Sequence, residues 1–268
     1  MSQDRATRTV PAMAAMKAAG QPITMLTAYD ASFARLVDEA DVDCVLVGDS
    51  LGNVIQGRDS TLPVTIEHMV YHVESVSRGL THPLLIADLP FMSYHDRASA
   101  MQAAAAVMRA GARMVKLEGG SGVVPLVADL VAQGIPVCGH LGLTPQHVHR
   151  LGGYRVQGRD EALARALQED ARGLEAAGAG MLVMECVPSG LASAIAENLR
   201  IPVIGIGAGV DVDGQVLVIY DVLGISPGRR PRFVRNFMDE AGSIPEALAA
   251  FVEAVRERRF PDDHYSYS

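Results

Sequence analysis

The sequence predicts a single-domain (β/α)8 TIM barrel whose active site lies at the C-terminal ends of the strands. Eight short apolar runs alternate with helical patterns, and no linker or low-complexity insert separates them. The length of 268 residues and the 49% hydrophobic content suit one barrel domain. In addition, four of the apolar runs are closed by an acidic residue, at the strand ends where barrel enzymes place their chemistry.

The predicted strands are short runs bounded by Gly, Pro or polar residues, which is typical of buried parallel strands. They cover residues 24–29, 44–48, 84–87, 114–117, 136–140, 181–185, 202–206 and 215–219. Between them the pattern predicts helices over residues 31–39, 66–79, 98–110, 123–132, 160–177 and 191–198. A last helix begins after Ser243, where the sequence Ser-Ile-Pro-Glu combines a capping box with proline in the first turn.

The barrel is expected to span residues 1–268 as one domain, with a short extension over about 1–22 and a flexible tail over about 260–268. The tail, FPDDHYSYS, is polar and is expected to fray unless it docks on a neighbouring subunit. A doubly wound open sheet is the alternative architecture. The absence of a GxGxxG turn after the first strand argues against it.

Three connections that follow strands are long or rich in turn residues. They cover residues 50–68, 90–97 and 141–159. Long loops inside a compact domain usually bind ligands or act as lids. Because all three leave the carboxyl ends of strands, we expect them to frame one mouth.

Composition excludes several classes of partner. The formal net charge is -8 and no long basic run occurs, which argues against nucleic acid and anionic membranes. No stretch is apolar enough for a membrane span. The three cysteines, Cys44, Cys138 and Cys186, lack CxxC spacing and are expected to be buried thiols in a reducing cytoplasm. A catalytic Cys186 is the less favoured alternative.

The acidic residues after the second, third and fourth strands are Asp49, Asp88 and Glu118. Carboxylates on neighbouring strands are hard oxygen donors that suit Mg²⁺, which retains part of its water shell. A single acid at such a position could instead cap the next helix or pair with a basic side chain. Three on one rim favour a metal site.

Lys116 precedes Glu118 by two residues, so both side chains point to the same face of the strand. Burying them inside a barrel is costly unless they serve a ligand or each other. A structural ion pair and a Schiff-base lysine are alternatives, and the surrounding carboxylates disfavour the second by keeping the amine protonated.

Glu185 follows the apolar run MLVM, and partial burial would raise its pKa and suit it to act as a general base. His140 ends the fifth strand and could contact an anionic substrate or orient a neighbour; a hydrogen-bonded core histidine is nearly as good an interpretation. Other signals are weaker. They are the pair His68 and His72, the pair His147 and His149, and the glycine-rich IGIGAG turn.

Read in order, these stretches resemble the ketopantoate hydroxymethyltransferase family. The most distinctive matching segments are LTAYDASFA, GDSLGNVIQGRDSTLPVT, ADLPFMSY, RMVKLEGG, PVCGHLGLTPQ, GGYRVQGR and IPVIGIGAG. They extend from about Leu26 to beyond Asp221 and so cover nearly the whole predicted barrel.

The resemblance implies a barrel enzyme that uses Mg²⁺ and the co-substrate 5,10-methylenetetrahydrofolate. It would transfer a hydroxymethyl group to 3-methyl-2-oxobutanoate through an enolate and give 2-dehydropantoate, a step of pantothenate biosynthesis. By position, the metal acids would be Asp49, Asp88 and Glu118, and the proton acceptor Glu185. The keto acid would be held by Asp49, Ser50, Asp88 and Lys116, with His140 as a further candidate. The resemblance also implies a cytoplasmic homo-oligomer, a homodecamer in the family.

Two other functions are consistent with parts of the pattern. One is a Mg²⁺-dependent lyase or mutase of the isocitrate lyase and phosphoenolpyruvate mutase type, which also stabilises an enolate but needs no folate. The other is a metabolite-binding barrel without catalysis. That reading predicts the loss of Lys116, Glu118 or Glu185, and all three are present.

Overall fold

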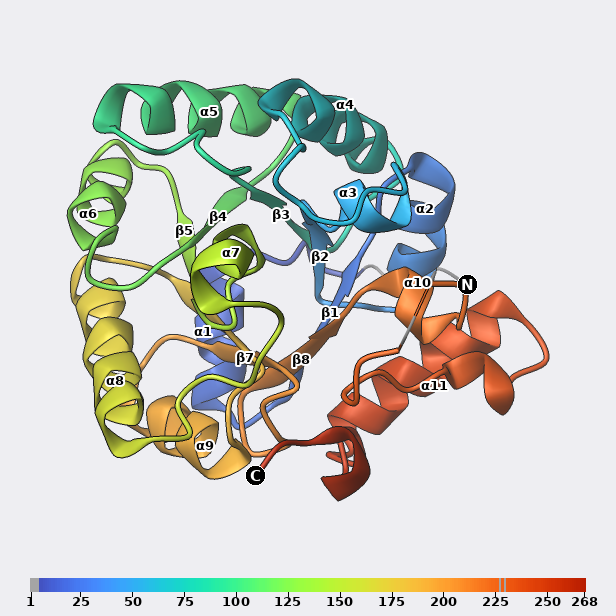
Figure 1. The fold of residues 1–268 in the computed structure, drawn as a ribbon. Coiled ribbons are helices and arrows are strands. Elements are labelled where there is room, and N and C mark those ends of the chain that lie inside the picture. Colours follow the sequence, from blue (N-terminus) through green and yellow to red (C-terminus); the bar gives the residue numbers. More distant parts are fainter. Residues whose placement is uncertain (1–4, 227, 229) are drawn as a thin grey trace.

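Eight parallel strands form a closed barrel in the computed structural model, which describes residues 5–226, 228 and 230–268 (Figure 1). Each strand pairs with the next in sequence and the last pairs with the first, so the predicted (β/α)8 fold is confirmed and the open sheet is wrong. The strands are β1 Ile23–Thr27, β2 Cys44–Val47, β3 Leu84–Asp88, β4 Met114–Glu118, β5 Val137–Gly142, β6 Met181–Glu185, β7 Val203–Ile206 and β8 Gly214–Leu217.

The longer helices surround the barrel, and shorter ones lie in the connections. The α-helices are α1 Val10–Ala18, α2 Ala31–Glu39, α3 Leu51–Val54, α4 Ile66–Ser77, α5 Arg97–Ala110, α6 Val124–Ala132, α7 Val148–Leu151, α8 Glu161–Ala176, α9 Ser189–Asn198, α10 Ile219–Val222 and α11 Ile244–Arg256. The 3₁₀ turns are η1 Pro145–His147, η2 Phe237–Asp239 and η3 Asp263–Tyr265.

Side-chain caps fix where several of these helices begin. Asp30, Asp96 and Asp160 accept backbone N–H groups at the starts of α2, α5 and α8, and Ser243 does so for α11 as its sequence predicts. The predicted strands and helices agree with the observed ones to within two residues at each end. The alternation of apolar runs and amphipathic stretches was therefore a sufficient guide to the barrel.

The N-terminal extension contains α1, which the sequence did not predict. Met13 on α1 is fully buried and its Sδ lies 3.3 Å from Sγ of Cys44, the first residue of β2. Lys17 Nζ donates to Asp213 Oδ2 at 2.7 Å, immediately before β8. The helix thus closes the N-terminal end of the barrel, opposite the mouth. Residues 1–4 of the extension lie outside the described residues.

The C-terminal tail differs from the expected frayed segment, because it packs on its own barrel. Phe260 is buried in a cluster with Phe237 and Phe251, where ring centroids lie 5.5–6.2 Å apart. Farther along, the carbonyl of Tyr267 accepts the N–H of Ser189 at 2.9 Å, at the start of α9. The tail is polar on average, so its composition did not indicate that a few aromatic residues would be buried. These residues bury enough apolar surface to order the segment.

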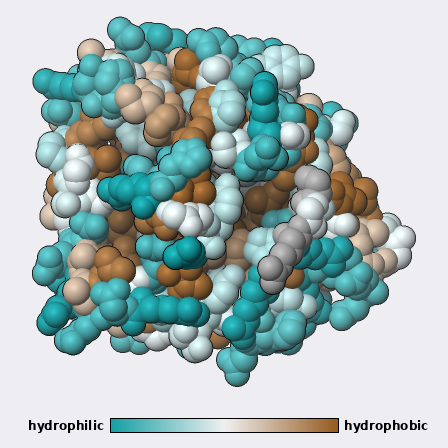
Figure 2. Space-filling view, in the orientation of Figure 1, coloured by the Kyte–Doolittle hydropathy of each residue, from teal (hydrophilic) through white to brown (hydrophobic). Residues whose placement is uncertain are grey.

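The barrel mouth is built from connections at the carboxyl ends of the strands. In the view of Figure 2 this face is hollowed, with hydrophobic residues at depth and mostly hydrophilic residues around them. Among the helices of the described chain, none is long and apolar enough to cross a membrane.

Candidate active site

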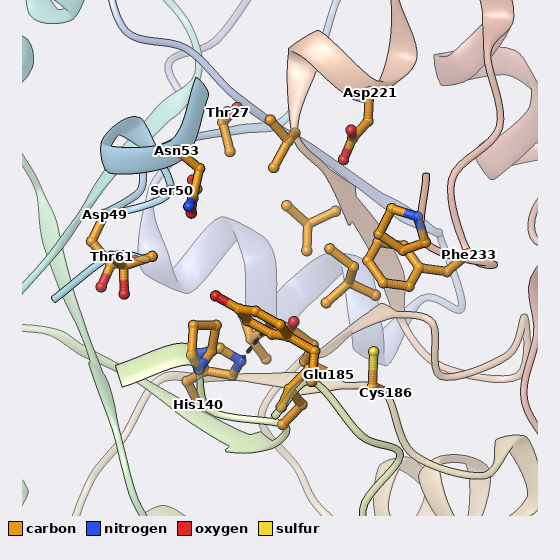
Figure 3. Close-up of a pocket in the computed structure, with 18 of the residues that line it drawn as sticks. Thr27, Asp49, Ser50, Asn53, Thr61, His140, Glu185, Cys186, Asp221 and Phe233 are labelled. Carbon is orange, nitrogen blue, oxygen red and sulfur yellow. Dashed lines mark ion pairs between the residues drawn. The ribbon is translucent and has the colours of Figure 1, made fainter. Parts of the chain in front are cut away.

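A cavity of about 920 Å³ opens at the carboxyl ends of the strands. Every residue predicted for the site lines it, so the structure brings the whole predicted set together. These residues are Asp49, Ser50, Asp88, Lys116, Glu118, His140 and Glu185. Figure 3 labels four of them, Asp49, Ser50, His140 and Glu185. The loop over residues 50–68 and the loop over residues 141–159 both line the cavity, as expected. The loop over residues 90–97 does not line it; its Tyr94 instead bonds Gln146 beneath the cavity floor.

Lys116 and Asp88 form a buried ion pair on adjacent strands, β4 and β3. Their Nζ and Oδ1 atoms lie 2.7 Å apart, and both side chains are about 5% exposed or less. Burial alone would lower the pKa of Lys116, but Asp88, Glu118 and Asp49 together raise it above its usual value. The amine is therefore an ammonium at neutral pH, which argues against a Schiff-base role.

Asp49 lies just after β2 and is buried beside the other acids. Its backbone N–H donates to Asp88 Oδ2 at 3.0 Å, and its own Oδ2 accepts from Gln146 Nε2 at 2.8 Å. Burial, followed by repulsion from Asp88 and Glu118, raises its pKa well above the usual range. Three carboxyl groups thus share one ammonium, which favours the protonated form of Asp49 until a further positive charge enters the site.

Ser50, which follows Asp49, is held by a neighbouring hydroxyl. Its Oγ lies 2.8 Å from the hydroxyl of Tyr29, a residue that is 2% exposed. In Figure 3 the Ser50, Asp49 and Asn53 side chains occupy the same side of the cavity. A hydroxyl fixed in this way is suited to donate to a substrate carboxylate.

His140 on β5 lies between the acid–lysine group and Glu185. Its Nδ1 is 3.2 Å from Lys116 Nζ, and its Nε2 is 3.2 Å from Glu185 Oε2, although the second contact is not aligned as a hydrogen bond. Burial and the nearby Lys116 charge lower the pKa of His140, so the ring is neutral at pH 7. Because the ammonium can only donate, Nδ1 is the acceptor and Nε2 carries the proton that faces Glu185.

Glu185 is the last residue of β6 and the most accessible of the strand-end acids, with 15% of its side chain exposed. The Leu143 N–H donates to its carbonyl at 2.8 Å, and Gly142 makes this approach possible. A Cβ on Gly142 would lie 2.2 Å from the Glu185 carbonyl oxygen, and the glycine also has φ +88°. The carboxylate is therefore held at the cavity wall, across from Asp49 (Figure 3).

The other predicted signals lie outside this chemistry. His68 completes a capping box with Thr65, and His72 Nδ1 lies 2.6 Å from the carbonyl of Tyr29. His147 Nδ1 lies 3.0 Å from Thr144 Oγ1 beside a smaller cavity of about 190 Å³. Burial raises the pKa of the Cys186 thiol, so it is a poor nucleophile although it lines the main cavity.

The carboxylates of the cavity could hold Mg²⁺ only as a small donor set. Within the described part of the chain, no three His, Cys, Asp or Glu side chains form a group that could hold a metal ion. Mg²⁺, however, is often bound by one or two carboxylates plus water and substrate oxygens. Asp49 and Asp88 fit this smaller set, since they are adjacent, buried oxygen donors, and a cation between them would favour the ionised form of Asp49. The predicted role of Glu118 as a metal ligand stays a prediction.

We expect the metal-free protein to lose stability as the pH rises from about 6 to 8. Burial raises the pKa of Glu118 to about 8; Lys116 lowers it in part and Asp88 raises it further. The folded state therefore holds a proton that the unfolded state has released, and the free energy of unfolding falls by up to about 1.4 kcal/mol per pH unit from this group. Denaturant unfolding in EDTA measures the slope.

The matched control for this pH series is Glu118→Gln, which removes one titrating acid and should make the slope shallower, while the raised pKa of Asp49 accounts for the slope that is left. A wild-type stability that rises over pH 6 to 8, or an unchanged slope in Glu118→Gln, would contradict the assignment.

Several residues at the site were not predicted from the sequence. Gln146 and Tyr94 lie beneath the acids, and Phe233, Arg232 and Tyr267 line the far side of the cavity. Gln146 stands within the quoted segment PVCGHLGLTPQ, so its position in a loop after a strand was the available signal. Tyr94 likewise ends the quoted segment ADLPFMSY, in the loop after the third strand. No local pattern marks Phe233, Arg232 and Tyr267, because they reach the cavity from the C-terminal part of the chain.

Comparison with known proteins is consistent with this site. The family model described as ketopantoate hydroxymethyltransferase matches residues 7–263. A relative from Nitrosococcus oceani is 58% identical over 94% of this chain and 96% of its own. One from Marinobacter nauticus is 54% identical over 97% and 98%. Both are named 3-methyl-2-oxobutanoate hydroxymethyltransferase.

Solved structures share the fold at low identity. A phosphonopyruvate hydrolase has a TM-score of 0.63 at 13% identity and covers 94% of this chain and 98% of its own. A 2,3-dimethylmalate lyase has a TM-score of 0.57 at 16% identity and covers 80% and 82%. These likenesses concern the barrel alone.

The extent of the family match, together with the relatives that exceed 50% identity, shows that the chain belongs to the ketopantoate hydroxymethyltransferase family.

Proposed function

We propose that this chain transfers a hydroxymethyl group from 5,10-methylenetetrahydrofolate to 3-methyl-2-oxobutanoate and gives 2-dehydropantoate, as part of pantothenate and coenzyme A biosynthesis. The observation that carries the proposal is the buried group of acids, lysine and neutral histidine in one cavity, in a chain whose relatives carry the name of this activity. The cavity of about 920 Å³ also exceeds the needs of a five-carbon keto acid and leaves space for a larger co-substrate.

Asp49 and Asp88 would hold Mg²⁺ together with the keto acid. When bound there, Mg²⁺ would supply Lewis-acid polarisation of the keto oxygen, worth several kcal/mol of charge stabilisation. The Lys116 ammonium, 2.7 Å from Asp88, would offset negative charge on the substrate, and the Ser50 hydroxyl would donate to its carboxylate.

Glu185 would accept the proton from C3 of the keto acid. The carboxylate stands at the cavity wall, with Nε2 of the neutral His140 ring 3.2 Å from its Oε2, so its neighbour carries no charge that would compete for the proton. The C3 carbon then attacks the methylene carbon of the folate. In full, water hydrolyses both carbon–nitrogen bonds that hold this carbon, which releases tetrahydrofolate and leaves the carbon as formaldehyde with the water oxygen. The C3 carbon attacks that carbonyl, a carbon–carbon bond forms, and the new alkoxide takes up a proton to give the hydroxymethyl group.

Two measurements separate this function from its alternatives. Purified protein with Mg²⁺ should exchange the C3 proton of 3-methyl-2-oxobutanoate for deuterium and should form 2-dehydropantoate only when methylenetetrahydrofolate is present. A lyase or mutase would cleave or rearrange a different oxyacid without folate. Binding of the keto acid without C3 exchange would instead indicate a non-catalytic barrel and overturn the proposal.

The Asp88→Asn variant should need a Mg²⁺ concentration about 10-fold or more above that of the wild type for half-maximal rate. The substitution removes one charged donor and also unpairs Lys116. Titration of activity against Mg²⁺ measures the effect, with Asp129→Asn on the outer helix α6 as the control. Unchanged metal dependence in Asp88→Asn would remove this residue from the proposed metal site.

The cytoplasmic location and the homodecamer are also part of the proposal. The three cysteines are unpaired thiols, which fits a reducing compartment. Light scattering of the purified protein would test the decamer directly.

A further inference from the structure

Gln146 connects three neighbouring strand ends from beneath the acid group. It lies in η1, after β5, and is 4% exposed. Its Nε2 donates to Asp49 Oδ2 at 2.8 Å and to the carbonyl of Leu89 at 3.0 Å, after β2 and β3. Its backbone N–H donates to Glu118 Oε2 at 2.9 Å, at the end of β4. Tyr94 completes the set by donating its hydroxyl to Gln146 Oε1 at 2.5 Å.

The hydrogen-bond network permits only one orientation of this amide. If the side chain were turned by 180°, Oε1 would face the Leu89 carbonyl, and two oxygens that can only accept would meet without a proton between them. In the observed orientation every donor and acceptor of the Gln146 side chain is used. A fully satisfied buried network of this kind is rigid, and it fixes the groups that it contacts.

We propose that Gln146 is a positioning residue that holds the Asp49 and Glu118 carboxylates in the arrangement needed by the divalent cation and the keto acid, a role that rests on the proposed function. Gln146 does not itself line the cavity; it acts through the two acids, which do, by its side-chain amide on Asp49 and its backbone N–H on Glu118. Because it occupies Asp49 Oδ2 and Glu118 Oε2, it leaves the other oxygen of each carboxylate for a ligand. Groups that orient metal ligands in this way usually affect affinity strongly when they are removed.

Gln146→Met tests the role, because methionine keeps the length of the side chain and removes the amide while the backbone N–H to Glu118 remains. Binding of Mn²⁺ alone, without substrates, is measured by electron paramagnetic resonance titration. We expect the Kd for Mn²⁺ to rise about 10-fold or more. The matched control is Gln102→Met, the same change on the exposed face of α5, which should keep the wild-type Kd.

Four outcomes decide the matter. A Gln146→Met protein that binds Mn²⁺ as the wild type does, even with a lower thermal midpoint, would overturn the positioning role and leave the proposed function intact. A wild-type protein that binds no Mn²⁺ would overturn both. If Gln146→Met does not fold, Tyr94→Phe replaces it, since only the hydroxyl that fixes the amide is lost. A several-fold rise in its Kd would then support the role, and no change would refute it.

Discussion

Glu185→Gln should lower kcat for hydroxymethyl transfer by about 10²- to 10⁴-fold while the KM for 3-methyl-2-oxobutanoate changes little. The amide is isosteric with the carboxylate but cannot accept the C3 proton. It also leaves the buried group of Asp49, Asp88, Lys116 and Glu118 intact, because Glu185 contacts that group only through His140. Since the lost function belongs to proton transfer, C3 deuterium exchange should fall in parallel with kcat.

The control for this prediction is Glu197→Gln, the same change on the exposed face of α9. It should leave both kcat and C3 exchange at wild-type values. Wild-type turnover in Glu185→Gln would disprove the base assignment. A loss of keto-acid affinity as large as the loss of kcat would instead place Glu185 among the residues that bind the substrate.

The barrel could be predicted from sequence because its signals are local and repeated. Each strand is a short apolar run, and each helix shows a capping residue or an amphipathic pattern nearby, so the alternation remains clear even where one signal is weak. The strand-end acids could be predicted for a related reason. Parallel strands of a closed barrel direct their carboxyl ends to a single mouth, so Asp49, Asp88, Glu118 and Glu185 had to gather once the fold was known.

The remaining parts of the site depend on contacts that no local pattern encodes. Gln146 is one polar residue in a loop, and its importance appears only when three strand ends converge on it. The tail has a polar composition, yet Tyr267 reaches the cavity because Phe260 anchors the chain beforehand. The metal-binding carboxylates, unlike the fold, cannot be chosen from sequence, because side-chain orientation decides which carboxylates can share an ion.

Composition contains a further signal about Lys116. The chain has only two lysines, Lys17 and Lys116, and its other basic residues are arginines. Arginine is the usual choice for a buried ion pair, because its planar fork bonds a carboxylate at two points. A lysine at the centre of three acids instead supplies a compact charge with separate donors, and these reach both Asp88 Oδ1 and His140 Nδ1.

Lys116→Met should therefore have the largest combined effect on stability and activity. The change leaves Asp49, Asp88 and Glu118 buried without a counter-charge, and losing one partner of a buried ion pair costs about 3–5 kcal/mol. The Lys116 pKa is raised in the folded state, so the ammonium contributes its full stability at neutral pH and loses it only in strongly alkaline solution. We also expect kcat/KM to fall about 10²-fold or more, because the charge that faces the substrate is gone.

Denaturant unfolding at two pH values separates this electrostatic effect from lost packing. The deficit of Lys116→Met should be larger at pH 8 than at pH 5.5, because the uncompensated acids can take up protons at the lower pH. Lys17→Met is the matched control: it removes the only other lysine, which pairs with Asp213 at the closed end of the barrel. Its stability loss should be smaller, and keto-acid binding should not change. An equal deficit at both pH values would mean that Lys116 stabilises the barrel through its methylene chain, and the acids would then need a different counter-charge.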